Sequence, residues 1–118
     1  MPKFMMILHD DMARLSKMAP AEMQRVIAQY NAWSAKLAQA GKLAGGEKLR
    51  DEGGKHLTAK GGKMVVRDGP YAEAKEVVGG YFLIEADDYA EATALCADCP
   101  HLALGGRIEL REIDPMPS

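Results

Sequence analysis

The segment GGYFLIEA, Gly79 to Ala86, decides the fold, because a glycine pair leads into a strand whose side chains are apolar on both faces. Tyr81 and Leu83 fall on one face, and Phe82 and Ile84 fall on the other. A strand of this kind needs cover above and below it. We therefore expect it near the centre of a sheet.

The N-terminal segment KFMMIL, Lys3 to Leu8, has the same two-faced pattern. After it, Pro20 opens a long helical pattern and Gly41 stops it. The apolar stripe of this helix recurs at steps of three and four residues, at Met23, Val26, Ile27, Tyr30, Trp33 and Leu37. The sequence thus predicts a strand followed by one amphipathic helix.

The region from Leu43 to Arg67 is rich in glycines and turns, which predicts a hairpin or meander. Asp87 or Asp88 then caps a second helix, and Pro100 ends it. The last strand, Arg107 to Ile113, alternates apolar and charged side chains, as expected near a sheet edge. The short β-like pieces of the hairpin region are Lys48–Leu49, His56–Ala59 and Lys63–Arg67, and the inner stripe of the second helix is Ala92, Leu95, Cys96 and Cys99.

This order of elements predicts an α+β domain over residues 1–118, of ferredoxin-like type (β-α-β-β-α-β) with an extra hairpin. Both helices of such a sheet lie on one face, so the second apolar face of the sheet stays open. This open face carries Met5–Ile7 and Phe82–Ile84, or the complementary sets of these strands. Each such side chain left in water forgoes roughly 1.5–3 kcal/mol. We expect a homodimer that packs sheet against sheet as a dimeric α/β barrel. The alternative is that the extra hairpin folds back over the open face of its own chain.

Composition narrows the function classes. The chain has 118 residues and a formal charge of −2, which gives no field that attracts nucleic acid or an anionic membrane. The longest uncharged apolar run, Phe4 to Leu8, falls far short of the roughly 20 residues that cross a bilayer, and no signal-peptide pattern precedes it. We expect a cytoplasmic protein.

The two cysteines, Cys96 and Cys99, form a C-x-x-C pair. Redox pairs of this spacing use a helix N-terminus to stabilise the thiolate, whereas these cysteines fall near a helix C-terminus, whose dipole opposes ionisation. A structural zinc site needs about four ligands, and even His101 raises the local number only to three. We interpret the pair as small apolar side chains that close the helix, with no metal and no cofactor.

Several side chains could carry chemistry. His9 follows the first strand, and Asp10 or Asp11 could hold it as a base; the alternative is a solvent-facing loop histidine. His101 follows Pro100, where its charge could cap the second helix. Tyr30 and Trp33 are interpreted as core or interface residues, or as the flat wall of a cleft for an aromatic or isoprenoid ligand. His56 is assigned no role.

The run DGPYAEAKEVVGGYFLIEA, Asp68 to Ala86, resembles the defining motif of the DGPF subgroup of the YCII-related domain family. The resemblance extends over nearly the whole chain, through the segments GGEKL at residues 45–49 and CPHLALGGRIELREI at residues 99–113. Tyr71 replaces the usual Phe, Ala74 the usual Thr, and Ala19 the usual Ser cap before Pro20. The last change is expected to weaken the helix start by about 1 kcal/mol.

The resemblance implies a ferredoxin-like α+β dimer, similar to the muconolactone isomerase group, with a cleft between the first helix and the sheet. Members of the wider family are proposed to be enzymes because of a His on the first helix and an Asp before a Pro after the second. Here the first position is Tyr30 or close to it, and Cys99 precedes Pro100 with Asp98 one residue further back. The dyad is absent from this sequence, so no reaction carries over.

Three functional hypotheses follow. The first is a small-molecule binding protein or enzyme with a site formed by Tyr30, Trp33, Asp68, Tyr71 and Lys75. The second is a regulatory or interaction module, because DGPF-type domains resemble proteins that occur alongside or fused to extracytoplasmic-function sigma factors. The third is an inert structural dimer. Within the first hypothesis, the candidate catalytic residues are His9, Tyr30 and Asp68.

Overall fold

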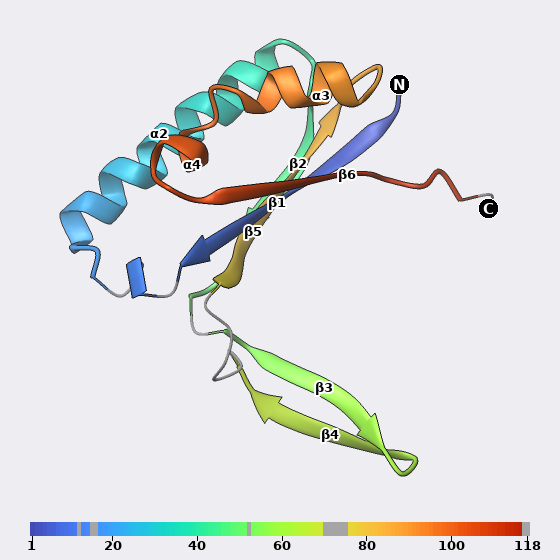
Figure 1. Ribbon diagram of the computed structural model, residues 1–118. Helices are drawn as coiled ribbons and strands as arrows, with labels where there is room; N and C mark the ends of the chain where they lie inside the picture. The colour runs from blue at the N-terminus through green and yellow to red at the C-terminus, as the bar shows by residue number, and fades with distance from the viewer. Residues whose placement is uncertain (12, 15–16, 52, 70–75, 117–118) are drawn as a thin grey trace.

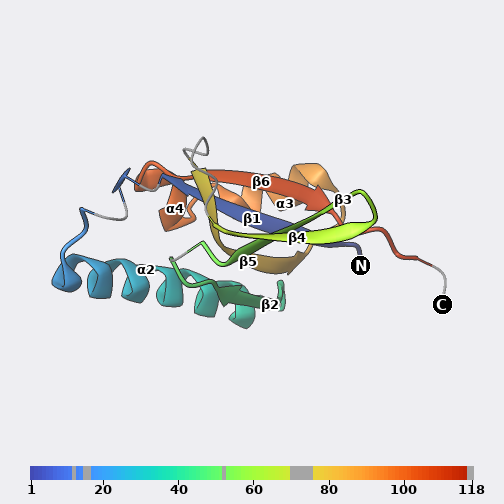
Figure 2. The ribbon, with the colours of Figure 1, turned by 90° about the horizontal axis from the view of Figure 1, so that it is seen from below.

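The computed structural model describes residues 1–11, 13–14, 17–51, 53–69 and 76–116. Its main body is a four-stranded sheet in the order β2-β5-β1-β6, with every neighbouring pair antiparallel (Figures 1 and 2). This α+β arrangement is compatible with a ferredoxin-like fold. The strands are β1 (Lys3–Asp11), β2 (Leu43–Lys48), β3 (Lys55–Lys60), β4 (Lys63–Asp68), β5 (Glu76–Glu85) and β6 (Arg107–Glu112), and the helices are α2 (Pro20–Gln39), α3 (Tyr89–Cys96) and α4 (Pro100–Ala103).

The two strands with two apolar faces, β1 and β5, are the central pair of the sheet, as predicted. Their register sets Met5 opposite Leu83 and Ile7 opposite Tyr81. A bulge interrupts this ladder, because Leu8 pairs with Gly80 whereas His9 pairs with Val78. The bulge lies at the end of β1 that approaches α4.

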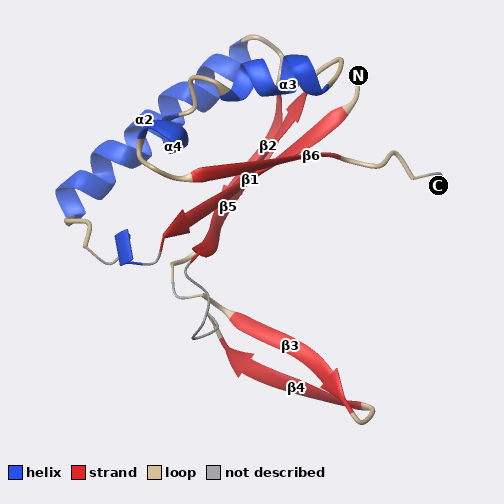
Figure 3. Cartoon of the chain, viewed as in Figure 1, coloured by secondary structure: helices blue, strands red, loops and turns tan. Residues whose placement is uncertain are grey.

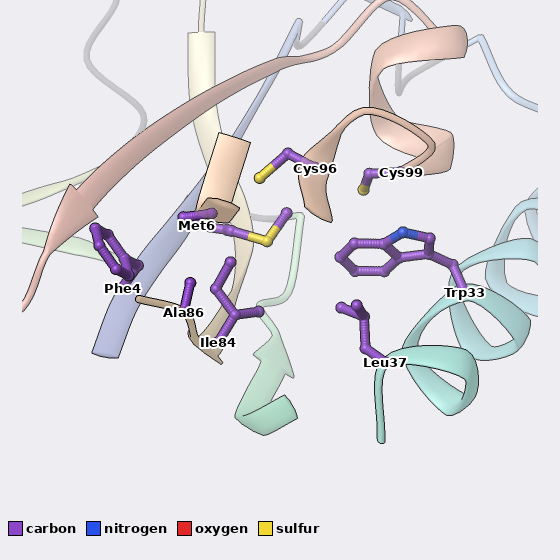
Figure 4. Packing of buried hydrophobic residues seen from close by; sticks show 9 residues of the cluster. Phe4, Met6, Trp33, Leu37, Ile84, Ala86, Cys96 and Cys99 are labelled. Carbon is purple, nitrogen blue, oxygen red and sulfur yellow. The ribbon is translucent and has the colours of Figure 1, made fainter. Parts of the chain in front are cut away.

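The helices cover one face of the main sheet (Figure 3), and the hydrophobic core lies between them and that face (Figure 4). The sheet contributes one face of its central strands, and α2 and α3 contribute their apolar stripes. Phe4, Met6 and Ile84 are completely buried there. The core cluster consists of Phe4, Met6, Trp33, Leu37, Ile84, Ala86, Ala92, Cys96 and Cys99.

The helix ends follow local chemistry. The α2 helix begins at Pro20 without a side-chain cap on Ala19, and Gly41 after its end has a φ of 72°. At the start of α3, the Asp88 carboxylate accepts a hydrogen bond from the Glu91 N–H. Glu91 in turn accepts from the Asp87 N–H, so the predicted capping box has its reciprocal bond one residue earlier than expected.

The end of the second helix differs from the prediction. The α3 helix stops at Cys96, and Pro100 opens the short helix α4 instead of only ending α3. Both cysteines are free and buried. Burial, together with the neighbouring Cys99, raises the pKa of the Cys96 thiol to about 11, which disfavours the nucleophilic thiolate.

The face of the sheet that the helices leave uncovered carries Met5, Ile7, Tyr81 and Leu83, which we call the open face. The side chains of this face are half-buried in the chain by itself. Of the two alternatives for β5, the open face carries Tyr81 and Leu83, because Phe82 and Ile84 point to the helix side.

The extra hairpin, β3–β4, forms a separate two-stranded sheet that extends away from the main sheet (Figure 1). Leu57, Met64 and Val66 on this hairpin are half-exposed or more. The alternative in which the hairpin folds over the open face of its own chain is therefore wrong.

Candidate functional site

A cavity of about 450 Å³ lies between α2 and the sheet, and its volume falls in the range of small-molecule sites. Most of its wall is apolar. The helix contributes Met23, Val26 and Ile27, and the strands contribute Leu8, Leu43 and Phe82. The Trp33 ring packs against Phe82 in a T-shaped arrangement from the core side, with ring centroids 5.1 Å apart.

Tyr30 of α2 and His101 of α4 form the polar pair of this cavity. The Tyr30 hydroxyl oxygen lies 2.7 Å from Nδ1 of His101. Nε2 of His101 lies 2.8 Å from the backbone carbonyl oxygen of His9 on β1. The imidazole thus bridges the first helix to the first strand, although 71 residues separate it from Tyr30.

These contacts determine the tautomer of His101. A carbonyl oxygen only accepts hydrogen bonds, so Nε2 must carry the proton that it donates to His9. In the neutral ring Nδ1 is then an acceptor, and the Tyr30 hydroxyl donates to it.

Burial keeps both members of the pair uncharged. His101 is completely shielded from solvent, and this desolvation lowers the pKa of its imidazole. Desolvation also raises the pKa of Tyr30 to about 12. The expected role of His101 as a charged cap on the second helix is therefore wrong, because the ring is neutral and both nitrogens bond elsewhere.

A glycine makes room for the imidazole. A Cβ atom on Gly106 would lie within 3.0 Å of Nε2, Cε1 and Cδ2 of His101, closer than real Cβ atoms approach other atoms. The Gly106 N–H also donates to the His101 carbonyl at 2.9 Å. Only glycine fits beside this ring without displacement.

The charged side chains at the cavity form two internal ion pairs. Arg14 pairs with Asp10 of β1, and Lys48 Nζ lies 3.2 Å from Asp51 Oδ1. Glu47 contributes to the wall, but in register it lies opposite Tyr81, which belongs to the open face. Apart from the two pairs, Glu47 therefore leaves the described wall with one excess negative charge.

The structure brings together only part of the site that the sequence predicts. Tyr30 lines the cavity, whereas Trp33 is buried in the core, where its Nε1–H donates to Asp98 at 3.1 Å. Asp68 lies on the hairpin, where it forms an ion pair with Lys55, and it is not part of the cavity wall. The two other candidates, Tyr71 and Lys75, lie outside the described residues.

His9 has a different partner from the one expected. Its Nε2 lies 2.9 Å from Oε1 of Glu109 on β6, while Asp10 pairs with Arg14. Its side chain is not part of the cavity wall, and only its backbone carbonyl takes part in the site, through His101. The solvent-facing loop reading is also wrong, because His9 belongs to β1 and its side chain is only 15% exposed.

Sequence reasoning missed His101 as a member of the site. Two local signals were available. Pro100 at the start of a helical turn predicts a new helix as well as the end of the old one, and the glycine pair Gly105–Gly106 indicates a close approach of another group to the backbone. Neither signal identifies Tyr30 as the partner.

Comparison with known families now places the chain. Residues 3–117 match the YCII-related domain. The chain belongs to the YCII-related family. An uncharacterised protein of Rhizobium meliloti (strain 1021) is similar, with 29% identity over 96 residues, which cover 80% of this chain and 77% of the relative.

In this YCII-related chain, Tyr30 and His101 meet close to the positions where the family resemblance suggested a His–Asp dyad, and Asp98 instead bonds to Trp33 and Lys36. The described ranges contain no cluster of three or more His, Cys, Asp or Glu side chains arranged to hold a metal ion. None of the helices within them combines the length and the apolar character needed to cross a membrane.

Proposed function

We propose that this YCII-related chain binds a small, largely apolar organic molecule in the cavity between α2 and the sheet, with the Tyr30–His101 pair as its polar anchor. The observation that carries the proposal is the part-buried Tyr30–His101 hydrogen bond of 2.7 Å in the wall of a largely apolar cavity. A few convergent polar groups in an apolar pocket are typical of small-molecule sites.

The construction of the anchor supports a role beyond packing. Three elements, α2, α4 and β1, each supply one group to the chain of hydrogen bonds. The β1 bulge lies beside the His9 carbonyl that ends this chain, and bulges recur next to functional sites. A purely structural core would be filled more simply by apolar side chains, because buried polar groups carry a desolvation cost.

A ligand screen tests the proposal. A compound that binds only the folded chain raises its melting temperature by linkage, so a thermal-shift screen against small apolar metabolites should give hits. Ile27→Trp fills the cavity from the exposed side of α2 and should abolish these shifts. Ala28→Trp places the same ring at an exposed position outside the cavity wall and should leave them unchanged. Shifts that persist in Ile27→Trp would show that the ligand binds elsewhere.

We propose further that the chain forms a homodimer through its open face. Two apolar surfaces support this: the open face itself, and one side of the hairpin, where Leu57 pairs with Val66 and Ala59 pairs with Met64. The chain alone has a radius of gyration of 16.2 Å, whereas a compact domain of this length has about 13.5 Å. A second copy would cover both surfaces and complete a dimeric α/β barrel.

Within the family, we propose that the chain belongs to the DGPF subgroup, on the basis of the sequence of residues 68–86. A regulatory role beside sigma factors would use an outer surface and not the cavity. The Ile27→Trp variant separates the two roles, because it should lose small-molecule binding and keep any protein interaction. Loss of a sigma-factor interaction in this variant would contradict that separation.

A further inference from the structure

We propose that the ligand of this cavity is a neutral hydrogen-bond donor, such as an alcohol, a phenol or an enol, which donates its O–H to the hydroxyl oxygen of Tyr30. The inference rests on the proposed function, because it names the chemical class that this site selects. It depends on the direction of the two hydrogen bonds that hold the anchor.

The direction of both hydrogen bonds follows from the backbone carbonyl of His9. The His9 carbonyl cannot donate, so the hydrogen of the 2.8 Å contact belongs to Nε2 of His101. The neutral imidazole has one N–H, which leaves Nδ1 as an acceptor. The only hydrogen available for the 2.7 Å contact is therefore the Tyr30 hydroxyl hydrogen.

This direction limits which hydrogen bond a ligand can form with Tyr30. A phenol has one O–H to donate, and Tyr30 has already committed it to His101. The phenolic oxygen retains lone pairs, and Tyr30 lines the cavity. The anchor can thus accept a hydrogen bond from a ligand, but it cannot donate one without breaking the bond to His101.

The rest of the wall narrows the class further. The ion pairs Asp10–Arg14 and Lys48–Asp51 balance their own charges, and the Ser34 hydroxyl donates to the Asn31 carbonyl at 3.1 Å. Glu47 adds a carboxylate to the described wall outside these two pairs, so an anionic ligand would lose its hydration and meet a like charge there. A neutral molecule with an apolar body and one donor group fits these surroundings.

Three probes of nearly the same shape test the proposal: 2-naphthol, which donates and accepts, 2-methoxynaphthalene, which only accepts, and 2-methylnaphthalene, which does neither. Binding to the full-length wild-type chain is measured by isothermal titration calorimetry at pH 7.5. We expect 2-naphthol to bind about five- to tenfold more tightly than 2-methylnaphthalene, the gain of one net hydrogen bond. The methoxy compound should gain nothing over the methyl compound.

Two results would overturn the proposal in different ways. If 2-methoxynaphthalene gains as much over the methyl compound as 2-naphthol does, Tyr30 donates to the ligand, and the donor class is wrong while the site stands. If none of the three binds, the proposed function itself is wrong, because the apolar wall should hold the hydrocarbon alone.

A pair of matched variants assigns the effect to Tyr30. Tyr30→Phe should reduce the preference for 2-naphthol over 2-methylnaphthalene at least threefold. Tyr89→Phe removes a tyrosine hydroxyl that accepts a hydrogen bond from the Glu112 N–H, away from the cavity, and should keep the preference. An unchanged preference in Tyr30→Phe would overturn the assignment.

A measurement on the wild type does not depend on how the variants fold. Nitrogen-15 NMR of the histidine side chains should show His101 with its proton on Nε2 and a bare Nδ1 at pH 7.5. A proton on Nδ1 would reverse the direction of the Tyr30 bond and overturn the proposal.

Discussion

Two aromatic side chains far apart in the sequence, Tyr30 and His101, make the polar end of the cavity, and their surroundings hold them neutral. Gly106 leaves space for the imidazole, and the His9 carbonyl orients it. At the scale of single residues, the site depends on shape next to the ring and on the direction of hydrogen bonds.

Gly106→Ala tests whether the space beside the His101 ring requires a glycine. The added methyl group would overlap His101, and overpacking of this kind costs about 1–3 kcal/mol. We expect the free energy of unfolding, measured by urea denaturation, to fall by that amount. Gly45→Ala is the matched control, because its Cβ would lie 3.7 Å from Leu83 Cδ1, an ordinary contact. Equal losses in the two variants would contradict the tight fit at Gly106.

The protonation of His101 gives a prediction on pH. Burial lowers the pKa of the folded imidazole, so below about pH 6.5 the unfolded chain binds a proton that the folded chain does not. The free energy of unfolding should therefore decrease as the pH falls through this range, until the folded imidazole itself becomes protonated. NMR titration of His101 should give a midpoint below 6.5, and a midpoint at or above that value would show that the ring is not desolvated.

At the scale of elements, the α2 helix connects the core to the cavity. Trp33 and Leu37 of its stripe are buried in the core, while Tyr30 and Ile27 of the same stripe face the cavity. The helix starts without a side-chain cap, since Ala19 has extended backbone angles but no side-chain oxygen to accept a hydrogen bond. Its first turn is therefore less stable than it could be.

Ala19→Ser should correct this start. The serine hydroxyl can accept from the free N–H groups of the first turn, so we expect the free energy of unfolding to rise by about 0.5–1 kcal/mol. Thermal or urea denaturation measures the change. Ala19→Val lacks the oxygen and should give no gain, and a gain as large as that of serine would argue against a capping effect.

At the scale of the whole molecule, the chain exposes more apolar surface than its own elements can cover. The helices shelter one face of the sheet, and the hairpin points away from the other (Figure 1). Exposed apolar patches of this kind mark interaction surfaces. Here the two patches belong to one chain, which favours a second copy as the cover for both.

Light scattering after size exclusion tests the homodimer. The wild type should have twice the 12.8 kDa mass of the chain. Leu83→Lys places a charge in the middle of the open face, opposite Met5 and Gly45, and should give a monomer, because a buried unpaired ammonium is strongly unfavourable. Ala28→Lys, on the exposed side of α2, should remain a dimer. A wild-type chain that is monomeric at micromolar concentration would contradict the proposed homodimer.

Much of the fold could be read from periodic patterns. The two-faced segments at Lys3–Leu8 and Tyr81–Ala86 are the central strands, and the stripe after Pro20 is the long helix. Local spacing carries this information, because each side chain's face depends only on the period of its own element. The same reasoning placed Tyr30 on the inner side of α2 and the cysteines among the core residues.

The site required the tertiary structure. The approach of His101 to Tyr30 depends on how α4 docks on α2 and β1, and no spacing within the sequence encodes a contact across 71 residues. The same holds for Asp68, which the family motif suggested for the site and which the hairpin carries away from the cavity wall. The sequence by itself determined the elements and their apolar faces. Only the folded chain decided which polar groups meet, because that meeting follows from the packing of several elements at once.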